Sequence, residues 1–238
     1  MEQDNKDKLD ILFFGKKECP YSEEALNYLK QKNTNVTIVL SENRFDKVPS
    51  EILNWVGDYI LSFNNYIIIP QKLISKAKKR AINFHPAPPK YPGSGSANLA
   101  LFNDDENFGV TAHQLVAEID SGEIIEVSYF PIKENYNVKT LLNEAHNELL
   151  VLFKKIVSLL VKNDKKILDM LYKENNHEWN GPARKIKEID KFQKISPTLT
   201  EKEIMKHIRS FHTKNFPIYI ELHGLKFYLE NKIDGIDY

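Results

Sequence analysis

The chain has 238 residues, of which 42% are hydrophobic, so it can bury one large core or one core with a small appendage. Its 33 basic and 33 acidic side chains cancel, which argues against a surface dedicated to nonspecific binding of nucleic acid. The apolar runs are too short or too interrupted to span a bilayer, and the polar N-terminus lacks a signal-peptide pattern, so we expect a cytoplasmic protein. The single cysteine, Cys19, predicts neither an internal disulfide nor a zinc site.

The first part of the chain alternates predicted strands with predicted helices. Strands are expected at residues 9–15, 35–42, 58–63 and 81–85, and helices after a Ser22 N-cap, after Pro49 and across residues 70–80. This alternation predicts parallel pairing in a Rossmann-like, doubly wound α/β sheet, whose ligands bind at the carboxyl ends of the strands. The glycine motifs GxGxxG and GxxxxGK[ST] do not follow any of these strands, so the two commonest phosphate-binding loops are not expected.

The rest of the chain predicts a change of character near residue 175. Further expected elements are a helix capped by Ser94 or Ser96, β-rich segments on either side of a turn at residues 120–122, a long amphipathic helix over 138–162, a helix with a capping box at Thr200, and a hairpin around residues 223–224. We therefore expect a mostly parallel α/β domain over residues 1–175. A C-terminal region of loop, helix and β-hairpin would follow over residues 176–238.

The segment INFHPAPPKYPGSG, residues 82–95, predicts a polar site whose position is fixed by a rigid loop. Asn83 and His85 are two apart in a strand, so they share one face and lie at its carboxyl end. The prolines and glycines that follow fix the backbone and then allow a sharp turn. A carboxylate such as Asp120 placed against His85 would fix its tautomer and raise its basicity. Each residue also has a structural interpretation: Asn83 as a strand-end amide, His85 as a buried histidine, Asp120 as a turn former.

Two stretches carry a resemblance to a known family. INFHPAPPKYPGSGSANLAL, residues 82–101, followed by FGVTAHQLVAEIDSGEII, residues 108–125, resembles the formyltransferase family that uses N10-formyltetrahydrofolate. The resemblance implies that Asn83, His85 and Asp120 form the catalytic trio. Asn83 would stabilise an oxyanion, while His85 would accept or donate a proton and Asp120 would position it. Whether His85 or Asp120 takes the proton stays open, and no metal is implied.

The resemblance also implies where the folate cosubstrate lies. Backbone groups of the segment SFNNYIIIP, residues 62–70, would bond the pterin, and the isoleucines would wall its ring. An ordinary core strand is the alternative for these isoleucines, and a purely structural role is the alternative for His113. The expected folate contacts are Phe63, Asn64, Ile67, Ile68, Ile69, His113 and Asp120.

Within the family, the sequence of residues 82–101 and the C-terminal segment WNGPARKIKEID most resemble the sugar N-formyltransferases. These act on dTDP-linked 4-amino-4,6-dideoxyglucose, or its 3-amino isomer, for surface polysaccharide such as O-antigen. Methionyl-tRNA formyltransferase carries an added basic domain for which this neutral chain has little room, and glycinamide ribonucleotide formyltransferase has a glycine-rich loop that is not seen here. A formyltetrahydrofolate hydrolase and a noncatalytic binding module are the remaining alternatives.

For a dTDP-sugar, an aromatic face suits the thymine and cations suit the diphosphate. Trp179 is expected to offer that aromatic face. Arg184 and a lysine are expected to supply the positive charge. The terminal hairpin carries more apolar side chains than a lone hairpin can cover, so we expect a homodimer. The expected substrate contacts are Lys16, Lys79, Tyr91, Gly93, Ser94, Trp179, Asn180 and Arg184.

Overall fold

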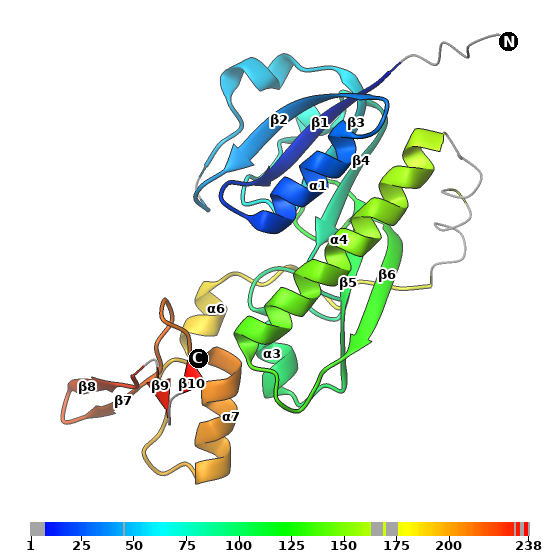
Figure 1. The fold of residues 1–238 in the computed structure, drawn as a ribbon. Helices are drawn as coiled ribbons and strands as arrows, with labels where there is room; N and C mark the ends of the chain where they lie inside the picture. Colours follow the sequence, from blue (N-terminus) through cyan, green and yellow to red (C-terminus); the bar gives the residue numbers. More distant parts are fainter. Residues whose placement is uncertain are drawn as a thin grey trace, which may run out of the picture.

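A computed structural model describes residues 8–44, 46–162, 169 and 176–230, together with the backbone of 232–233 and 236–237. Its centre is a six-stranded sheet in the order β2-β1-β3-β4-β5-β6 (Figure 1). The strands are β1 (Leu9–Lys16), β2 (Thr34–Ser41), β3 (Gly57–Phe63), β4 (Ala77–His85), β5 (Asn107–Gln114) and β6 (Ile124–Pro131). The main helices are α1 (Pro20–Lys30), η1 (Ser50–Asn54), α2 (Gln71–Ile74), α3 (Ser96–Phe102) and α4 (Val138–Lys162).

The first four strands pair in parallel, and the last two add antiparallel. β1 lies between β2 and β3, β3 pairs with β4, and all three pairings are parallel. β5 and β6 each run antiparallel to the preceding strand in the sheet. This arrangement confirms the predicted mostly parallel α/β sheet. It also brings the carboxyl ends of β1, β3 and β4 to one edge of the sheet, where an open α/β fold binds its ligands.

Two apolar clusters cover the two faces of the sheet. The larger cluster lies under α1, α3 and α4, and at its centre the Phe153 ring makes edge contacts with Phe13, Phe63 and Phe84. The smaller cluster packs the opposite face and includes Ile67 with residues of α2. Side chains along a strand alternate between the two faces of the sheet. Polar residues at the carboxyl ends of neighbouring strands can therefore point to either face and still lie at the same edge of the sheet.

Three local predictions are corrected. Cys19, not Ser22, is the N-cap residue of α1, and the Ser22 hydroxyl instead accepts the backbone N–H of Lys16 at 3.0 Å. The helix predicted over 70–80 stops at Ile74, because the following residues join β4, whose ladder with β3 starts at Ala77. Pairing with a central strand outweighs the local helix preference of this lysine-rich segment.

The third correction concerns the start of α3. Its N-cap is Gly95, with a left-handed φ of 75°, rather than Ser94 or Ser96. Glycine adopts this conformation without strain, which allows the sharp turn from the proline loop into the helix. The Ser96 hydroxyl points back into that loop and donates to the carbonyl oxygens of Tyr91 and Gly93, at 3.0 and 3.1 Å.

The C-terminal region forms a second, smaller layer. It contains α6 (Lys187–Asp190), α7 (Glu201–Phe211), a hairpin of β7 (Tyr219–Leu222) and β8 (Leu225–Tyr228), and the short β9 (Lys232–Ile233) and β10 (Ile236–Asp237). Thr200 and Glu203 form the predicted capping box, and α7 packs against α3 through a cluster that includes Phe102, Phe192 and Phe211. The predicted boundary at residue 175 lies outside the described residues. None of the helices described is long and apolar enough to cross a membrane.

Candidate active site

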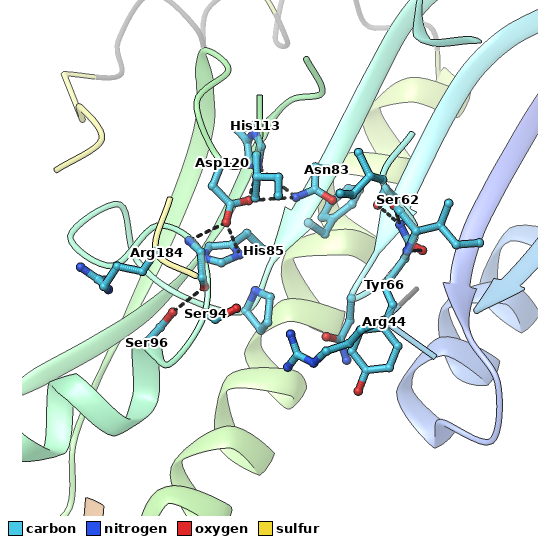
Figure 2. Close-up of a pocket in the computed structure, with 18 of the residues that line it drawn as sticks. Arg44, Ser62, Tyr66, Asn83, His85, Ser94, Ser96, His113, Asp120 and Arg184 are labelled. Atoms are coloured by element: carbon cyan, nitrogen blue, oxygen red, sulfur yellow. Dashed lines mark hydrogen bonds and ion pairs between the residues drawn. The ribbon is translucent and has the colours of Figure 1, made fainter. Parts of the chain in front are cut away.

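Asn83, His85 and Asp120 meet at the carboxyl edge of the sheet, and Figure 2 shows their side chains pointing toward one another. β4 delivers Asn83 and His85. β5 runs antiparallel beside it, with His113 opposite Asn83 in register. The chain then leaves β5 and returns in the loop that contains Asp120, so residues far apart in the sequence come together.

The Asp120 carboxylate contacts the other polar groups of the site. Its Oδ2 atom lies 3.3 Å from Nδ1 of His85 and accepts the backbone N–H of Gly93 at 2.8 Å. Its Oδ1 atom lies 3.5 Å from Nδ2 of Asn83. Asp120 itself has a left-handed φ of 45°, a conformation that a short aspartate side chain tolerates better than most. The structure thus brings the amide, the imidazole and the carboxylate into one hydrogen-bonding group.

Electrostatics keep this carboxylate charged. Burial of Asp120 opposes ionisation, but the interactions with His85 and with His113, whose Nε2 atom lies 3.4 Å from Oδ1, and the hydrogen bond from the N–H of Gly93 more than compensate, so the pKa of Asp120 lies well below its usual value. Burial lowers the pKa of His85, and the Asp120 carboxylate works against this effect. At neutral pH the site therefore holds an ionised Asp120 beside a neutral His85.

The two nitrogens of His85 both face oxygen acceptors. Nδ1 faces Asp120, and Nε2 lies 3.3 Å from the carbonyl oxygen of Tyr91. A neutral imidazole has one N–H and can donate to only one of these oxygens, whereas an imidazolium donates to both. These two oxygens therefore offset part of the cost of charging the buried ring, so His85 can accept a proton during the reaction although it is neutral at rest.

His113 supports the amide. Its Nδ1 atom donates to the backbone carbonyl of Gln114 at 2.8 Å, so in the neutral ring Nε2 accepts from Nδ2 of Asn83 at 3.0 Å. The Trp179 ring covers His113, with ring centroids 4.9 Å apart, and its Nε1 donates to the carbonyl oxygen of Gly122 at 2.7 Å. The hydrogen bond with His113 thus fixes the orientation of the Asn83 side chain.

Two glycines permit the close backbone contacts behind the site. A Cβ atom on Gly93 would lie 2.3 Å from the backbone nitrogen of Arg184, and one on Gly122 would lie 1.9 Å from the carbonyl oxygen of Gln114. The φ of Gly93 is +81°, which aims its N–H at Asp120. Side chains at either position would push apart the segments that position Asp120.

A cavity of about 510 Å³ opens in front of the trio and extends to both faces of the sheet edge. One arm, which we call the apolar arm, is lined by residues 67–69 and 115–119, and Ile67, Ile69 and Leu115 belong to the smaller core cluster. The other arm lies on the α1/α4 side, and we call it the polar arm; it is lined by Lys16, Asn64, Leu142 and His146. Residues 93–98 with Arg184 and Ile186 complete the rim.

Among the predicted folate contacts, Asn64, Ile67, Ile68, Ile69, His113 and Asp120 line this cavity. Phe63 does not, because it is fully buried under α4, with its ring 6.4 Å from that of Phe84 and 5.2 Å from that of Phe153. The Asn65 carboxamide ties the loop together by accepting the N–H of Ile67 at 2.6 Å. This bond holds the isoleucines against the cavity.

Among the predicted substrate contacts, Lys16, Gly93, Ser94 and Arg184 line the cavity, and four other residues do not. Lys79 lies in the first half of β4, away from the site, and pairs with Asp58 at 3.4 Å. Trp179 packs edge-on against His113, outside the cavity lining, and is partly exposed. The Tyr91 side chain is buried, with its hydroxyl on Asp105, and Asn180 is an exposed residue whose N–H bonds the carbonyl of Pro89.

The predicted contacts omit several residues that line the cavity, although two of these, Ser62 and Tyr66, lie in the segment 62–70 that the sequence analysis assigned to the folate. The Tyr66 ring contacts two cations, with Nζ of Lys16 at 4.2 Å and Cζ of Arg44 at 5.3 Å from its centre, and Figure 2 shows Tyr66 and Arg44 together at the cavity. Ser62 could have been found, since it is a polar residue at the carboxyl end of the strand expected over residues 58–63, and the structure pairs it with Asn83. His146 gives no local signal, because it is one polar position on a long amphipathic helix.

The arrangement defines a class of site. An amide donor beside an imidazole–carboxylate pair can stabilise an oxyanion and accept a proton, and together these are the requirements of transfer at a carbonyl carbon. The α/β sheet places that group at the edge where such folds bind ligands. The fold and the site thus define an α/β protein of the acyl-transfer type.

Comparison with known proteins gives the family. Residues 40–155 match the family described as formyl transferase, so this segment of the chain is a formyltransferase-family domain. A methionyl-tRNA formyltransferase from Streptococcus suis is 36% identical over 92 residues, which is 38% of this chain. The matched segment spans only 29% of the length of that relative.

Solved structures with the same fold cover nearly the whole chain. A 4-N formyltransferase from Francisella tularensis has a TM-score of 0.75 at 17% identity, over 96% of this chain and 99% of its own. An N-formyltransferase from Helicobacter canadensis, solved with folinic acid and dTDP-3-aminofucose, has a TM-score of 0.67 at 22% identity, over 95% of this chain and 90% of its own. At these identities the likeness shows a shared fold.

Proposed function

We propose that the protein transfers a formyl group from N10-formyltetrahydrofolate to the amine of a dTDP-linked amino-dideoxy sugar. The preferred acceptor is dTDP-4-amino-4,6-dideoxyglucose, with a role in surface polysaccharide such as O-antigen. The observation that carries the proposal is the contact of Asn83, His85 and Asp120 at the mouth of a cavity with two arms. The formyltransferase-family domain over residues 40–155 supports the reaction type.

The residues divide the chemistry among them. The acceptor nitrogen forms a bond to the formyl carbon, the bond from that carbon to N10 breaks, and N10 leaves with the proton that His85 has taken from the attacking amine. Nδ2 of Asn83 keeps one N–H on His113 and turns the other, whose contact with Asp120 is long at 3.5 Å, to the oxygen that becomes negative. His85 takes the proton of the attacking amine, because as an imidazolium it can donate to both oxygens that face it. The ionised Asp120 stabilises that imidazolium.

The apolar arm suits the folate. Ile67 and Ile69 are buried at its wall, and the neighbouring Ile68 and residues 116–117, which also line this arm, can offer backbone groups to a heteroaromatic ring. When bound there, N10-formyltetrahydrofolate supplies the electrophilic formyl carbon beside Asn83. The Helicobacter canadensis relative was solved with folinic acid, a formylated folate.

The sugar acceptor is supported by the relatives that share the fold over nearly the whole chain. Their names include a 4-N formyltransferase and an N-formyltransferase with dTDP-3-aminofucose. The curated relatives that match a shorter segment are methionyl-tRNA formyltransferases, so initiator tRNA is the second candidate acceptor.

The testing experiment compares acceptors. Purified protein with N10-formyltetrahydrofolate is assayed with dTDP-4-amino-4,6-dideoxyglucose, with its 3-amino isomer and with methionyl-tRNA, by mass spectrometry of the acceptor. We expect formylation of the sugars with the higher kcat/KM for the 4-amino compound. Formylation of methionyl-tRNA alone, or release of formate without any acceptor, would refute the proposal.

Arg184 is proposed to bind the diphosphate. Its Nε and Nη2 atoms are buried without a hydrogen-bond partner in the part of the chain that the structure describes, so an anion would satisfy them. Its guanidinium also lies 5.4 Å from the Tyr91 ring. We expect Arg184→Ala to raise the KM of the sugar nucleotide about tenfold or more and to change kcat little. The exposed neighbour Lys185→Ala is the control; a fall in kcat at unchanged KM would contradict the diphosphate role.

The hairpin of β7 and β8 is proposed to pair two subunits. Leu225, Phe227 and Tyr228 are more than half exposed on it, at 64%, 52% and 57%. Exposed apolar side chains on a short hairpin favour association. We expect a homodimer in sedimentation velocity at micromolar concentration, and Leu225→Glu combined with Phe227→Glu should shift it to monomer. A wild-type monomer under these conditions would exclude the pairing.

A further inference from the structure

His146 lies in the polar arm of the cavity and has no part in the chemistry described above. It projects from α4, its Nε2 atom lies 2.9 Å from Nδ2 of Asn64, and its ring packs on Tyr21 with centroids 5.1 Å apart. Asn64 follows the last residue of β3 with a left-handed φ of 46°. This turn takes the Asn64 side chain away from the direction of the strand and toward α4.

The chemistry of the pair fixes its hydrogen-bond direction. An amide nitrogen can only donate, so Nε2 of His146 accepts and the neutral ring carries its proton on Nδ1. Burial, and the nearby charge of Lys16, lower the pKa of His146 to about 4, which keeps the ring neutral near pH 7. With its nitrogen committed to His146, Asn64 keeps its oxygen free; Oδ1 accepts no hydrogen bond from any residue in the described ranges.

The two arms of the cavity differ in the ligand chemistry they fit. The apolar arm offers Ile67, Ile69 and Leu115 to a flat ring. The polar arm offers the fixed oxygen of Asn64 and the ammonium of Lys16, which sits over Tyr66. A hydroxylated ligand that carries negative charge matches the second arm, because its O–H groups can donate to the amide oxygen and its phosphates can approach the cation.

We propose that His146 is a specificity-determining positioning residue for the acceptor, since it holds Asn64 so that Oδ1 accepts a hydrogen bond from a hydroxyl of the sugar. This inference rests on the function proposed above. Asn64 thereby contacts the acceptor rather than the folate. His146 acts only through Asn64 and selects acceptors that carry a donor group at this point.

Three variants test the role. His146→Ala removes the acceptor atom that holds Asn64, His146→Gln keeps an acceptor oxygen at similar reach, and Asn147→Ala changes the adjacent exposed residue of the same helix. Steady-state kinetics with the preferred sugar nucleotide give separate KM values for acceptor and formyl donor, and calorimetry gives the affinity for folinic acid. Thermal melting shows that each variant is folded.

We expect His146→Ala to raise the acceptor KM about five- to tenfold, the loss of one fixed hydrogen bond, with little change in kcat or in the donor KM. His146→Gln should recover most of this loss, and Asn147→Ala should behave as wild type. Weakened folinic acid binding in His146→Ala at an unchanged acceptor KM would overturn the assignment, as would no change in either. An absence of wild-type turnover with any sugar nucleotide would instead refute the proposed function itself.

Discussion

The His85→Ala variant is expected to lose about 10²- to 10⁴-fold in kcat, which is the usual contribution of a positioned general base. The structure gives the physical reason. Proton uptake by His85 is stabilised by two oxygens that face its nitrogens, those of Asp120 and of the Tyr91 carbonyl. Alanine removes the acceptor and leaves an ionised carboxylate without its main partner. Single-turnover kinetics with saturating donor and acceptor measure this loss.

Because His85 is buried, its removal can also disturb packing, so folding is checked separately. His85→Gln keeps more of the volume, and folinic acid binding reports whether the folate arm is intact. Added imidazole should restore part of the activity of the alanine variant. His223→Asn, at the exposed tip of the hairpin, is the matched control and should keep wild-type kcat. Wild-type activity in both His85 variants would rule out the proposed base.

The second large effect is expected from Asn83→Ala. Removing one oxyanion donor typically lowers kcat about 10²- to 10³-fold. Here the substitution also leaves Nε2 of His113 without the donor that lies 3.0 Å away. We expect kcat to fall with little change in either KM, because the amide acts on charge that develops during the reaction.

Asn83→Asp tests the donor role of Nδ2 more specifically than Asn83→Ala. It keeps the shape of the side chain but replaces the donor by an acceptor close to Asp120, so we expect it to be at least as impaired as Asn83→Ala. Asn107→Ala, at the exposed start of β5, is the control. A rise in the donor KM at unchanged kcat would assign Asn83 to folate binding instead of to the oxyanion.

The hydrophobic pattern of the chain was sufficient for most of the architecture. β-branched and aromatic runs separated by polar helical segments predicted the strands of the sheet, and the long amphipathic repeat predicted α4 over residues 138–162. The prediction was wrong over residues 77–80, where local composition favours a helix. There the edge of β3 offers a ladder that local sequence cannot reveal.

For the site, the sequence determined which polar residues share a strand end. Asn83 and His85 are two residues apart in the chain, so strand periodicity alone places them on one face. The same reasoning could not separate residues that reach the cavity from residues that turn away. Trp179, Lys79 and Phe63 have suitable chemistry, but the fold uses them for packing and surface pairing.

Only the tertiary structure decided the contacts between distant segments. Asp120 meets His85 because β5 returns beside β4 and the glycines of the two loops allow close backbone approach. His146 meets Asn64 because α4 crosses the sheet edge 82 residues later in the chain. Such contacts depend on how whole elements pack, and periodicity records only which face of its own element a residue occupies. The sequence by itself thus determined the sheet and the amide–imidazole pair, and the packing of the elements decided their partners.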